Sequence, residues 1–430
     1  MLIRLVISNF SSFDKEVEFN MLTASPQNLR HHVYHADEAK VLKAAAIYGA
    51  NGAGKSNLID AFRHLQQWVT AGVIQNSVDK LKFRLNSSNA QLPIFFEIEF
   101  FAAGMFFVYG IHLDDQHVIK EYLCESGMKQ TDKLIFKRSI DEMQKISVAF
   151  PDKNDTLKEK LESGLLKNNE LLLCHSIVAI PKVQAARDWL VNDLILMRPT
   201  TGQKELLLKL CTSDKFLQFS NQLTKTLDTG LSYIAVDKFD YNQLLSQNET
   251  LLFPVHQIEE HRIVPTDQGK YFTTKENGKI IFNRILAFHH RMENNPIAFD
   301  LAEESDGTQR LLEFFPIFAT MLERDVTIII DEIDQSIHPV LLKSLIKKIM
   351  AHKETLGQLI FTTHESNLLD LKIFREDEIW FAEKDKKTGA TEYYPLSDFN
   401  YSDELDLKTG YLNGRFGAIP FLANLKYLNW

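Results

Sequence analysis

The segment Gly49-Ala-Asn-Gly-Ala-Gly-Lys-Ser56 constrains the fold of this chain more than any other. It matches G-x-x-x-x-G-K-[ST] at every fixed position and follows the apolar run Ala44–Tyr48. A helical pattern comes next, with its apolar residues at Leu58, Ala61, Phe62 and Leu65. Glycine backbone N–H groups can turn toward a phosphate, and the N-terminus of a helix adds the positive end of its dipole. We therefore expect an α/β fold with a phosphate-binding loop at this position.

Each part of this loop has a predicted task. Lys55 is expected to reach the β- and γ-phosphates of a nucleotide, and the Ser56 hydroxyl is expected to bind Mg²⁺. The other residues predicted to contact the nucleotide are Gly49, Asn51, Gly52, Gly54 and Asn57. An ordinary glycine-rich turn would also contain such residues, but it would not need a buried strand before it and a helix after it.

A second apolar run, Asp325–Ile330, ends in the acidic pair Asp331-Glu332. Its β-branched residues are typical of a central parallel strand that is covered on both faces, and ligands bind at the carboxyl ends of such strands. We expect Asp331 to hold Mg²⁺, directly or through water, and Glu332 to orient and polarise an attacking water. Alone, the pair would also fit a solvated strand end; together with the phosphate loop it indicates a catalytic pair.

Three further features are expected to belong to the same site. Ser305 and Gly307 precede a helical pattern and would bind an anion there, although they also suit a plain helix N-cap. Asp334 lies in a turn directly after the acidic pair. His364 follows the apolar run Gln358–Thr363, where a contact with the γ-phosphate is expected.

The order of these features resembles an ABC-type ATPase of the RecF, SMC and OLD kind. The transporter motif Leu-Ser-Gly-Gly-Gln is replaced here by Ser305-Asp-Gly-Thr-Gln309, which argues against a transporter subunit. The finer resemblance is to prokaryotic AAA ATP-binding proteins of the RloA/AbiL kind, which are related to the ATPase of the PARIS defence system. The segments that carry it are Glu304–Leu311, Asp331–Pro339, Gln358–His364, Asp377–Lys384 and Tyr411–Pro420.

This resemblance implies an ATPase head that uses ATP and Mg²⁺, with a mixed sheet flanked by helices; the inserted, mainly helical arm is expected from the local patterns described below. It also implies a homodimer or higher oligomer that buries two nucleotides face to face. Ser305 and Gly307 of one copy would contact the γ-phosphate held by Lys55 of the other, and Asp334 would act across the interface. The catalytic residues would then be Glu332, His364 and Asp334. The biological role implied is anti-phage defence by abortive infection, through control of a separate TOPRIM-type nuclease effector.

Two other functions stay open at this point. A DNA-repair or DNA-end-binding ATPase would need clustered basic residues, and the densest basic run is Lys343, Lys347, Lys348, His352 and Lys353, which also fits a solvated helix face. A self-contained OLD-type nuclease would need a Glu and an Asp-x-Asp pair. No Asp-x-Asp occurs in the chain, so we expect any nuclease activity to come from a partner. Whether DNA or a phage protein acts as the trigger also stays open.

Composition is that of a large globular protein. A chain of 430 residues, 45% hydrophobic and 24% charged, is expected to form two or three domains. The net charge of -9 argues against a basic coat for non-specific nucleic-acid binding. The three cysteines, Cys124, Cys174 and Cys211, form no Cys-x-x-Cys pair, so neither a zinc site nor a disulfide framework is expected. With no apolar run long enough for a membrane span or signal peptide, we expect a cytoplasmic protein without membrane contact.

Local patterns divide the chain into three expected parts. Strand-like runs are Leu2–Ile7, Lys43–Tyr48, Ile94–Phe100 and Met105–Ile111; helical patterns are Leu157–Leu166, Val183–Leu196 and Lys204–Leu227. We expect an N-terminal lobe at 1–125, a helical insertion at 126–295 and a C-terminal lobe with a tail at 296–430. A long antiparallel coiled coil is the alternative for the insertion, although its patterns are short and irregular. The apolar tail, from Phe416 to Trp430, is expected to cover its own sheet edge or to dock a partner.

Overall fold

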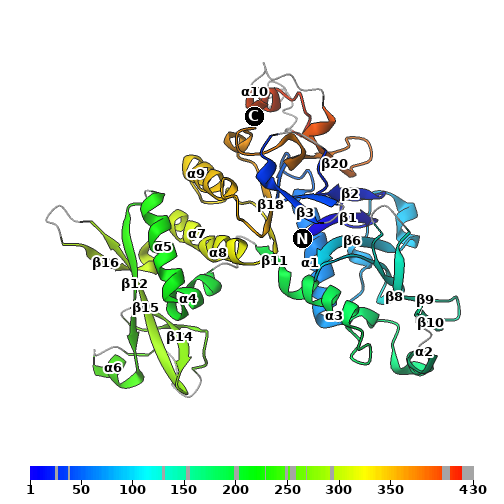
Figure 1. The fold of residues 1–430 in the computed structure, drawn as a ribbon, viewed down its shortest axis with the longest axis horizontal. Coiled ribbons are helices and arrows are strands. Elements are labelled where there is room, and N and C mark those ends of the chain that lie inside the picture. Colours follow the sequence, from blue (N-terminus) through cyan, green and yellow to red (C-terminus); the bar gives the residue numbers. More distant parts are fainter. Residues whose placement is uncertain are drawn as a thin grey trace, which may run out of the picture. The chain divides into compact units, whose positions relative to one another are not determined.

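The structure is a computed structural model. It describes residues 1–24, 28–36, 39–127, 131–151, 155–197, 203–227, 229–246, 250–251, 258–267, 269–290, 295–399 and 407–418. The chain divides into two compact units (Figure 1). Unit 1 contains Met1–Leu196, Asp325–Ile333 and Leu356–Trp430, and unit 2 contains Met197–Arg324 and Asp334–Thr355. The three-part division expected from composition stays a prediction.

The core of unit 1 is a six-stranded sheet that carries the phosphate loop at the end of one of its central strands. Its order is β11-β17-β18-β5-β19-β20. The four strands β17, β18, β5 and β19 are parallel neighbours, and β20 runs antiparallel to β19. The bounds are β5 Ala44–Tyr48, β11 Leu194–Met197, β17 Thr327–Ile330, β18 Gln358–Thr363, β19 Ile379–Lys384 and β20 Thr391–Pro395. Every residue of β5, β17 and β18 is buried, as expected for parallel strands covered on both faces.

A seven-stranded antiparallel sheet forms the second layer of unit 1, in the order β10-β9-β8-β7-β6-β1-β2. Its bounds are β1 Leu2–Ser8, β2 Val17–Asn20, β6 Ile94–Ala102, β7 Met105–Asp114, β8 His117–Glu125, β9 Lys133–Ile140 and β10 Ile146–Ala149. Helix α1, Lys55–Ala71, buries its predicted apolar face in one core shared with both sheets. The strands expected at Leu2–Ile7, Ile94–Phe100 and Met105–Ile111 are confirmed.

The remaining elements of unit 1 are short. They are the hairpin β3 Val33–Ala36 and β4 Ala39–Leu42, and helices α2 Asp155–Lys160, α3 Pro181–Asp188 and α10 Leu407–Leu412. Both α2 and α3 continue into a π-helical turn, which ends at Leu165 and Asp193 respectively. The α/β fold of a P-loop head, with sheets flanked by helices, is thereby confirmed.

Unit 2 contains an antiparallel sheet of order β12-β15-β14-β13, with β16 also paired to β15. The strands are β12 Leu231–Phe239, β13 Ile263–Pro265, β14 Lys270–Glu276, β15 Lys279–His289 and β16 Ile297–Asp300. Its helices are α4 Gln203–Thr212, α5 Asp214–Thr226, α6 Tyr241–Ser246, α7 Asp306–Glu313, α8 Phe315–Glu323 and α9 Pro339–Met350. The helical patterns expected at Leu157–Leu166, Val183–Leu196 and Lys204–Leu227 coincide largely with helices, the last with α4 and α5.

The expectation of a mainly helical region at 126–295 left out four strands of this sheet, which lie there beside the helices. The omission has a physical cause in β15. Phe282 packs on one face of the sheet with Leu244 of α6 and Tyr271, whereas Ile285 lines a cavity with Leu207 of α4. A strand that is buried on both faces loses the alternation by which a half-exposed strand is identified.

Among the described residues, none of the helices combines the length and the apolar character that crossing a bilayer requires. The part of the chain that the structure describes also holds no group of three or more His, Cys, Asp or Glu residues placed to bind a metal. All three cysteines are free. Burial raises the pKa of the Cys124 thiol to about 11, and that of Cys174 and of Cys211 to about 12, so none is a thiolate near neutral pH.

Candidate nucleotide site

The loop between β5 and α1 has a backbone that favours glycine at three positions. Gly52 and Gly54 have φ values of 78° and 106°, in the region that side chains rarely adopt. A Cβ atom at Gly54 would clash with the Thr391 side chain, and one at Gly49 would lie 2.5 Å from the Ala382 carbonyl oxygen. The loop therefore lies tightly against β19 and β20, and its backbone has the shape of a phosphate cradle.

Lys55 begins α1, with its side chain only 6% exposed. Its ammonium group donates hydrogen bonds to the carbonyl oxygens of Gly49, at 2.7 Å, and Ala50, at 3.2 Å. Because a buried charge is costly without partners, these contacts fix the ammonium group over the loop itself. An anion entering the loop would meet this fixed positive charge; the contact of Lys55 with a nucleotide stays a prediction.

Ser56 and Asp331 meet although 275 positions separate them, since β5 and β17 belong to one sheet. The Ser56 hydroxyl lies 3.4 Å from Asp331 Oδ1. Hard oxygen ligands are those that Mg²⁺ prefers, and it takes them in octahedral geometry. A hydroxyl and a carboxylate at this separation fit neighbouring positions of one such ion, so the residues present suit Mg²⁺.

Glu332 and His364 follow neighbouring strands of the core sheet. Glu332 comes two residues after β17 and has a φ of 50°. Its N–H donates to Thr362 Oγ1 in β18, at 2.7 Å. His364 comes directly after β18 and is exposed. Within unit 1 the structure thus brings Lys55, Ser56, Asp331, Glu332 and His364 to one edge of one sheet.

Three residues that the sequence analysis did not single out hold the phosphate loop in place. Thr391 Oγ1 lies 2.8 Å from the Ala53 carbonyl oxygen and 2.7 Å from Ser12 Oγ. Ser12 also accepts a hydrogen bond from the side-chain amide of Asn57, at 2.7 Å. Asn57, predicted to contact the nucleotide, thus supports the loop through Ser12.

The third of these residues, Tyr393, donates its hydroxyl to the carbonyl oxygen of Gly54 at 2.9 Å. Burial raises the pKa of the Tyr393 phenol well above its ordinary value, and the negative charge of Asp331 raises it further. The phenol is therefore protonated at any physiological pH and remains a donor to the loop. No motif marks these residues; pairing of β19 with β20 next to the loop is what places Thr391 and Tyr393 there.

The Ser305 turn lies in unit 2 and caps α7. Ser305 Oγ accepts a hydrogen bond from the Thr308 N–H, at 3.2 Å, and is itself exposed. A Cβ atom at Gly307 would lie 2.7 Å from the carbonyl oxygen of Ser336, so this turn packs closely on the turn that follows Asp334. The structure therefore brings the two predicted turns of unit 2 together. Their contact with a nucleotide stays a prediction.

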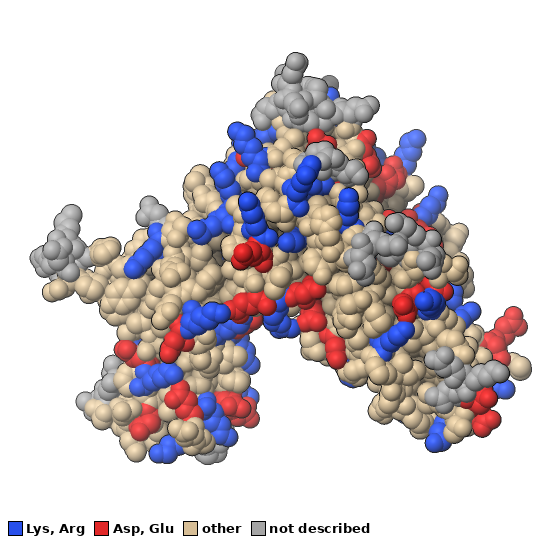
Figure 2. All heavy atoms as spheres, in the orientation of Figure 1, with Lys and Arg blue, Asp and Glu red and all other residues tan. Residues whose placement is uncertain are grey.

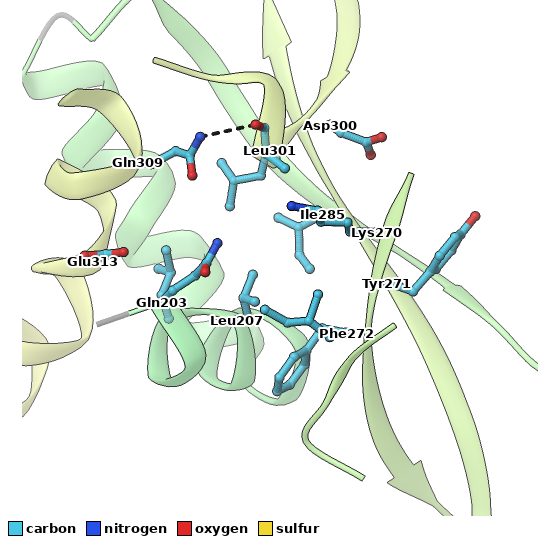
Figure 3. Close-up of a pocket in the computed structure, with 13 residues that line it drawn as sticks. Gln203, Leu207, Lys270, Tyr271, Phe272, Ile285, Asp300, Leu301, Gln309 and Glu313 are labelled. Carbon is cyan, nitrogen blue, oxygen red and sulfur yellow. Dashed lines mark hydrogen bonds between the residues drawn. The ribbon is translucent and has the colours of Figure 1, made fainter. Parts of the chain in front are cut away.

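A cavity of about 80 Å³ lies beside α7 within unit 2 (Figure 3). Its walls include apolar side chains of α4 and of the sheet, among them Leu207, Phe272 and Ile285. Gln309 of α7 reaches across its rim and donates to the carbonyl oxygens of Ala302, at 3.3 Å, and Glu304, at 2.7 Å. Gln309 therefore ties the segment that precedes Ser305 to the helix that follows it.

Comparison with known proteins places these observations in a family. The model of the family described as "AAA domain, putative AbiEii toxin, Type IV TA system" matches residues 44–188 and 216–370. No curated protein matches the chain.

Solved structures similar to this chain include SMC heads. The SMC head domain from Thermotoga maritima is 12% identical and has a TM-score of 0.42, with 92% of this chain and 98% of that chain covered. A second similar structure is the Smc head domain with an extended coiled coil, bound to the C-terminal domain of ScpA derived from Pyrococcus furiosus. It is 12% identical and has a TM-score of 0.44, with 96% of this chain and 98% of that chain covered.

The family match covers most of the chain and spans the phosphate loop, the Ser305 turn, the acidic pair and His364. The protein therefore belongs to the AAA-domain family described as "AAA domain, putative AbiEii toxin, Type IV TA system".

Proposed function

We propose that this protein is an ATPase that hydrolyses ATP at the edge of the core sheet of unit 1. The observation that supports this most is the approach of Ser56 to Asp331, at 3.4 Å, beside the buried Lys55 ammonium group. A metal-binding pair, a phosphate-binding cation and a carboxylate at Glu332 are the groups that phosphoryl transfer to water needs.

The proposed reaction assigns one task to each residue. Lys55 and the loop N–H groups hold the β- and γ-phosphates, while Ser56 and Asp331 hold Mg²⁺, which when bound neutralises charge on the phosphate oxygens. Glu332 orients a water whose oxygen forms a bond to the γ-phosphorus as the bond to the β–γ bridging oxygen breaks. The water proton passes to Glu332, and ADP and phosphate leave. His364 contacts the γ-phosphate from the end of β18.

A second copy of the chain completes this site in the proposed assembly. Ser305 is exposed at the N-terminus of α7, where helix N–H groups favour an anion. Ser305 and Gly307 of one copy would bind the γ-phosphate held by the other, and Asp334 would act at the same interface. ATP binding then favours the dimer and hydrolysis releases it, so the nucleotide switches the assembly between two states.

The biological role we propose is regulation of a separate toxic effector, of the TOPRIM nuclease type, in prokaryotic anti-phage defence in the cytoplasm. The family description, which names a toxin of a type IV toxin–antitoxin system, supports the defence class. A DNA-repair or DNA-end-binding role is the second candidate, favoured by the exposed Lys347 and Lys348 on α9. Acidic and basic side chains are interspersed on the face shown in Figure 2.

Capture of partners by an ATP-trapped variant tests this proposal. Tagged Glu332→Gln protein, expressed from its native locus, is expected to bind ATP, to dimerise and to hydrolyse ATP at least about a hundredfold more slowly, since the group that accepts the water proton is removed. The matched control is Lys55→Ala/Glu332→Gln, which should bind no ATP. A stoichiometric protein with a TOPRIM-like acidic motif, retained only by the single variant, supports effector control. Retention of nuclease-sensitive DNA without such a protein supports the second candidate, and normal turnover by Glu332→Gln contradicts the assigned base.

A further inference from the structure

Thr362 lies where β18 runs beside the acidic end of β17. Its side chain is 0% exposed, and its hydroxyl makes two hydrogen bonds. The hydroxyl oxygen accepts a hydrogen bond from the N–H of Glu332, at 2.7 Å, and the hydroxyl donates a hydrogen bond to Asp331 Oδ1, at 2.6 Å. Since a hydroxyl has a single proton, the direction of both bonds is fixed, and Thr362 links the two acidic residues.

The backbone of Thr362 adds a third contact. Its carbonyl oxygen accepts the N–H of Ile333 at 3.1 Å, so one residue of β18 binds two consecutive N–H groups of the neighbouring turn. Between these two contacts Glu332 has a φ of 50°, which a residue with a Cβ atom rarely adopts. A backbone in such a conformation persists only where its surroundings hold it, and here Thr362 supplies two of the contacts that do so.

The same hydroxyl also orients Asp331. Oδ1 of this carboxylate accepts a hydrogen bond from the Thr362 hydroxyl and lies 3.4 Å from the Ser56 hydroxyl. A hydrogen bond to a ligand carboxylate fixes the direction of its remaining lone pairs, and such contacts behind a metal ligand tune the affinity for the metal. The Thr362 hydroxyl therefore acts on the proposed ion ligand and on the proposed base together.

We propose that Thr362 is a positioning residue that couples the Mg²⁺ ligand Asp331 to the base Glu332. This inference rests on the proposed ATPase function and deepens it. Loss of the hydroxyl should weaken Mg²⁺-dependent nucleotide binding, through Asp331, and slow the chemical step, through Glu332. It should leave binding of the nucleotide through the phosphate loop in place, because the Thr362 hydroxyl bonds to Glu332 and Asp331 and Lys55 is held by the loop's own carbonyls.

The test uses three variants of the full chain, of which Thr363→Val is the matched control. Thr363 is the next residue of the same strand, is also 0% exposed, and its hydroxyl likewise accepts one N–H, that of Glu365 at 3.0 Å. Thr362→Val and Thr363→Val therefore remove the same group from equally buried positions. Thr362→Ser keeps the hydroxyl and removes only the methyl group.

Two readouts separate positioning from packing: kcat and KM of ATP hydrolysis, and the Mg²⁺ concentration that half-saturates binding of a fluorescent ATP analogue. For Thr362→Val we expect kcat to fall about tenfold and the half-saturating Mg²⁺ concentration to rise about tenfold, the size of one lost hydrogen bond to a charged group. KM at saturating Mg²⁺ should change little. Thr362→Ser should restore both values, and Thr363→Val should resemble the unmodified protein.

Wild-type kcat and Mg²⁺ dependence in Thr362→Val would overturn the inference. So would equal losses in Thr363→Val, or failure of Thr362→Ser to rescue, since both outcomes indicate packing alone. An unmodified protein that binds the analogue with Mg²⁺ but hydrolyses no ATP would overturn the proposed hydrolysis, while the Mg²⁺ readout would still decide the role of Thr362. Absence of Mg²⁺-dependent binding in the unmodified protein would overturn both.

Discussion

The phosphate loop of unit 1 and the Ser305 turn of unit 2 differ in where their support comes from. The loop is held by Ser12, Thr391 and Tyr393, which lie far from it in the sequence. The turn is held mainly by neighbours: Ser305 caps the helix that it begins, and Gln309 of the same helix binds the carbonyl oxygens before it. The half proposed to bind phosphate is thus built into a core, whereas the half expected to meet a second copy is an exposed, locally supported helix end.

The largest effect that tests this comparison comes from two glycines of the loop. Gly52 and Gly54 both have positive φ, but a Cβ atom at Gly52 would meet nothing within 4 Å, whereas one at Gly54 would clash with Thr391. Gly52→Ala should only add backbone strain to the loop, because a residue with a Cβ atom adopts this positive φ at a free-energy cost of about 1–2 kcal/mol. Gly54→Ala should weaken ATP binding on the order of a hundredfold, because the loop must move away from β20. Calorimetric titration with ATP measures both; equal effects would show that support from β20 is unimportant.

An intermediate effect is expected from Ser305→Ala. This change removes the N-cap of α7, which is worth about 1 kcal/mol of stability, and leaves the loop of unit 1 untouched. ATP affinity of the monomer should be unchanged, while ATP-dependent dimerisation, measured by light scattering in a Glu332→Gln background, should weaken about tenfold. Unchanged dimerisation would contradict the role proposed for the turn.

The smallest effect is expected from Tyr393→Phe, which removes one hydrogen bond to Gly54. ATP affinity should fall about fivefold, since a neutral hydrogen bond contributes about 1 kcal/mol. The pH dependence follows from the raised pKa of Tyr393. The pKa of the Tyr393 phenol is raised on folding above its unfolded value, which is near 10. The stability that the protonated phenol contributes is therefore fully present below pH 10 and is lost as the pH rises through the folded value. The ratio of the two affinities should therefore be constant between pH 7 and 9, and a change over that range would contradict the assignment.

Local sequence was enough to predict the parts of the site that depend on local geometry. The phosphate loop, the strand before Asp331 and the strand before His364 were all predicted from runs of fewer than ten residues. The structure confirms the strands β5, β17 and β18 and the helix α1 after the loop, while phosphate binding stays a prediction. Their signals are strong because a fully buried parallel strand must be apolar throughout and a phosphate cradle must contain glycine.

The parts that were missed depend on pairing between distant segments. Thr391 and Tyr393 matter only because β19 pairs with both β5 and β20, and Thr362 only because β18 lies beside β17. A threonine or tyrosine in a strand is ordinary, so nothing in its own neighbourhood marks it. The sheet of unit 2 was missed for a different reason. Burial of β15 on both faces hid the alternation of apolar and polar residues by which a strand is identified.

The position of β5 in the core sheet has a consequence for synthesis of the protein. Both neighbours of β5, the strands β18 and β19, come from residues made long after it. At ribosomal rates of about 5–20 residues per second, roughly 15 to 65 s separate Tyr48 from Thr363, the last residue of β18. During that interval the apolar strand Ala44–Tyr48 has left the ribosome with both edges unpaired, which is the state in which nascent chains aggregate. We therefore expect the yield of this protein to depend on chaperones that bind nascent chains.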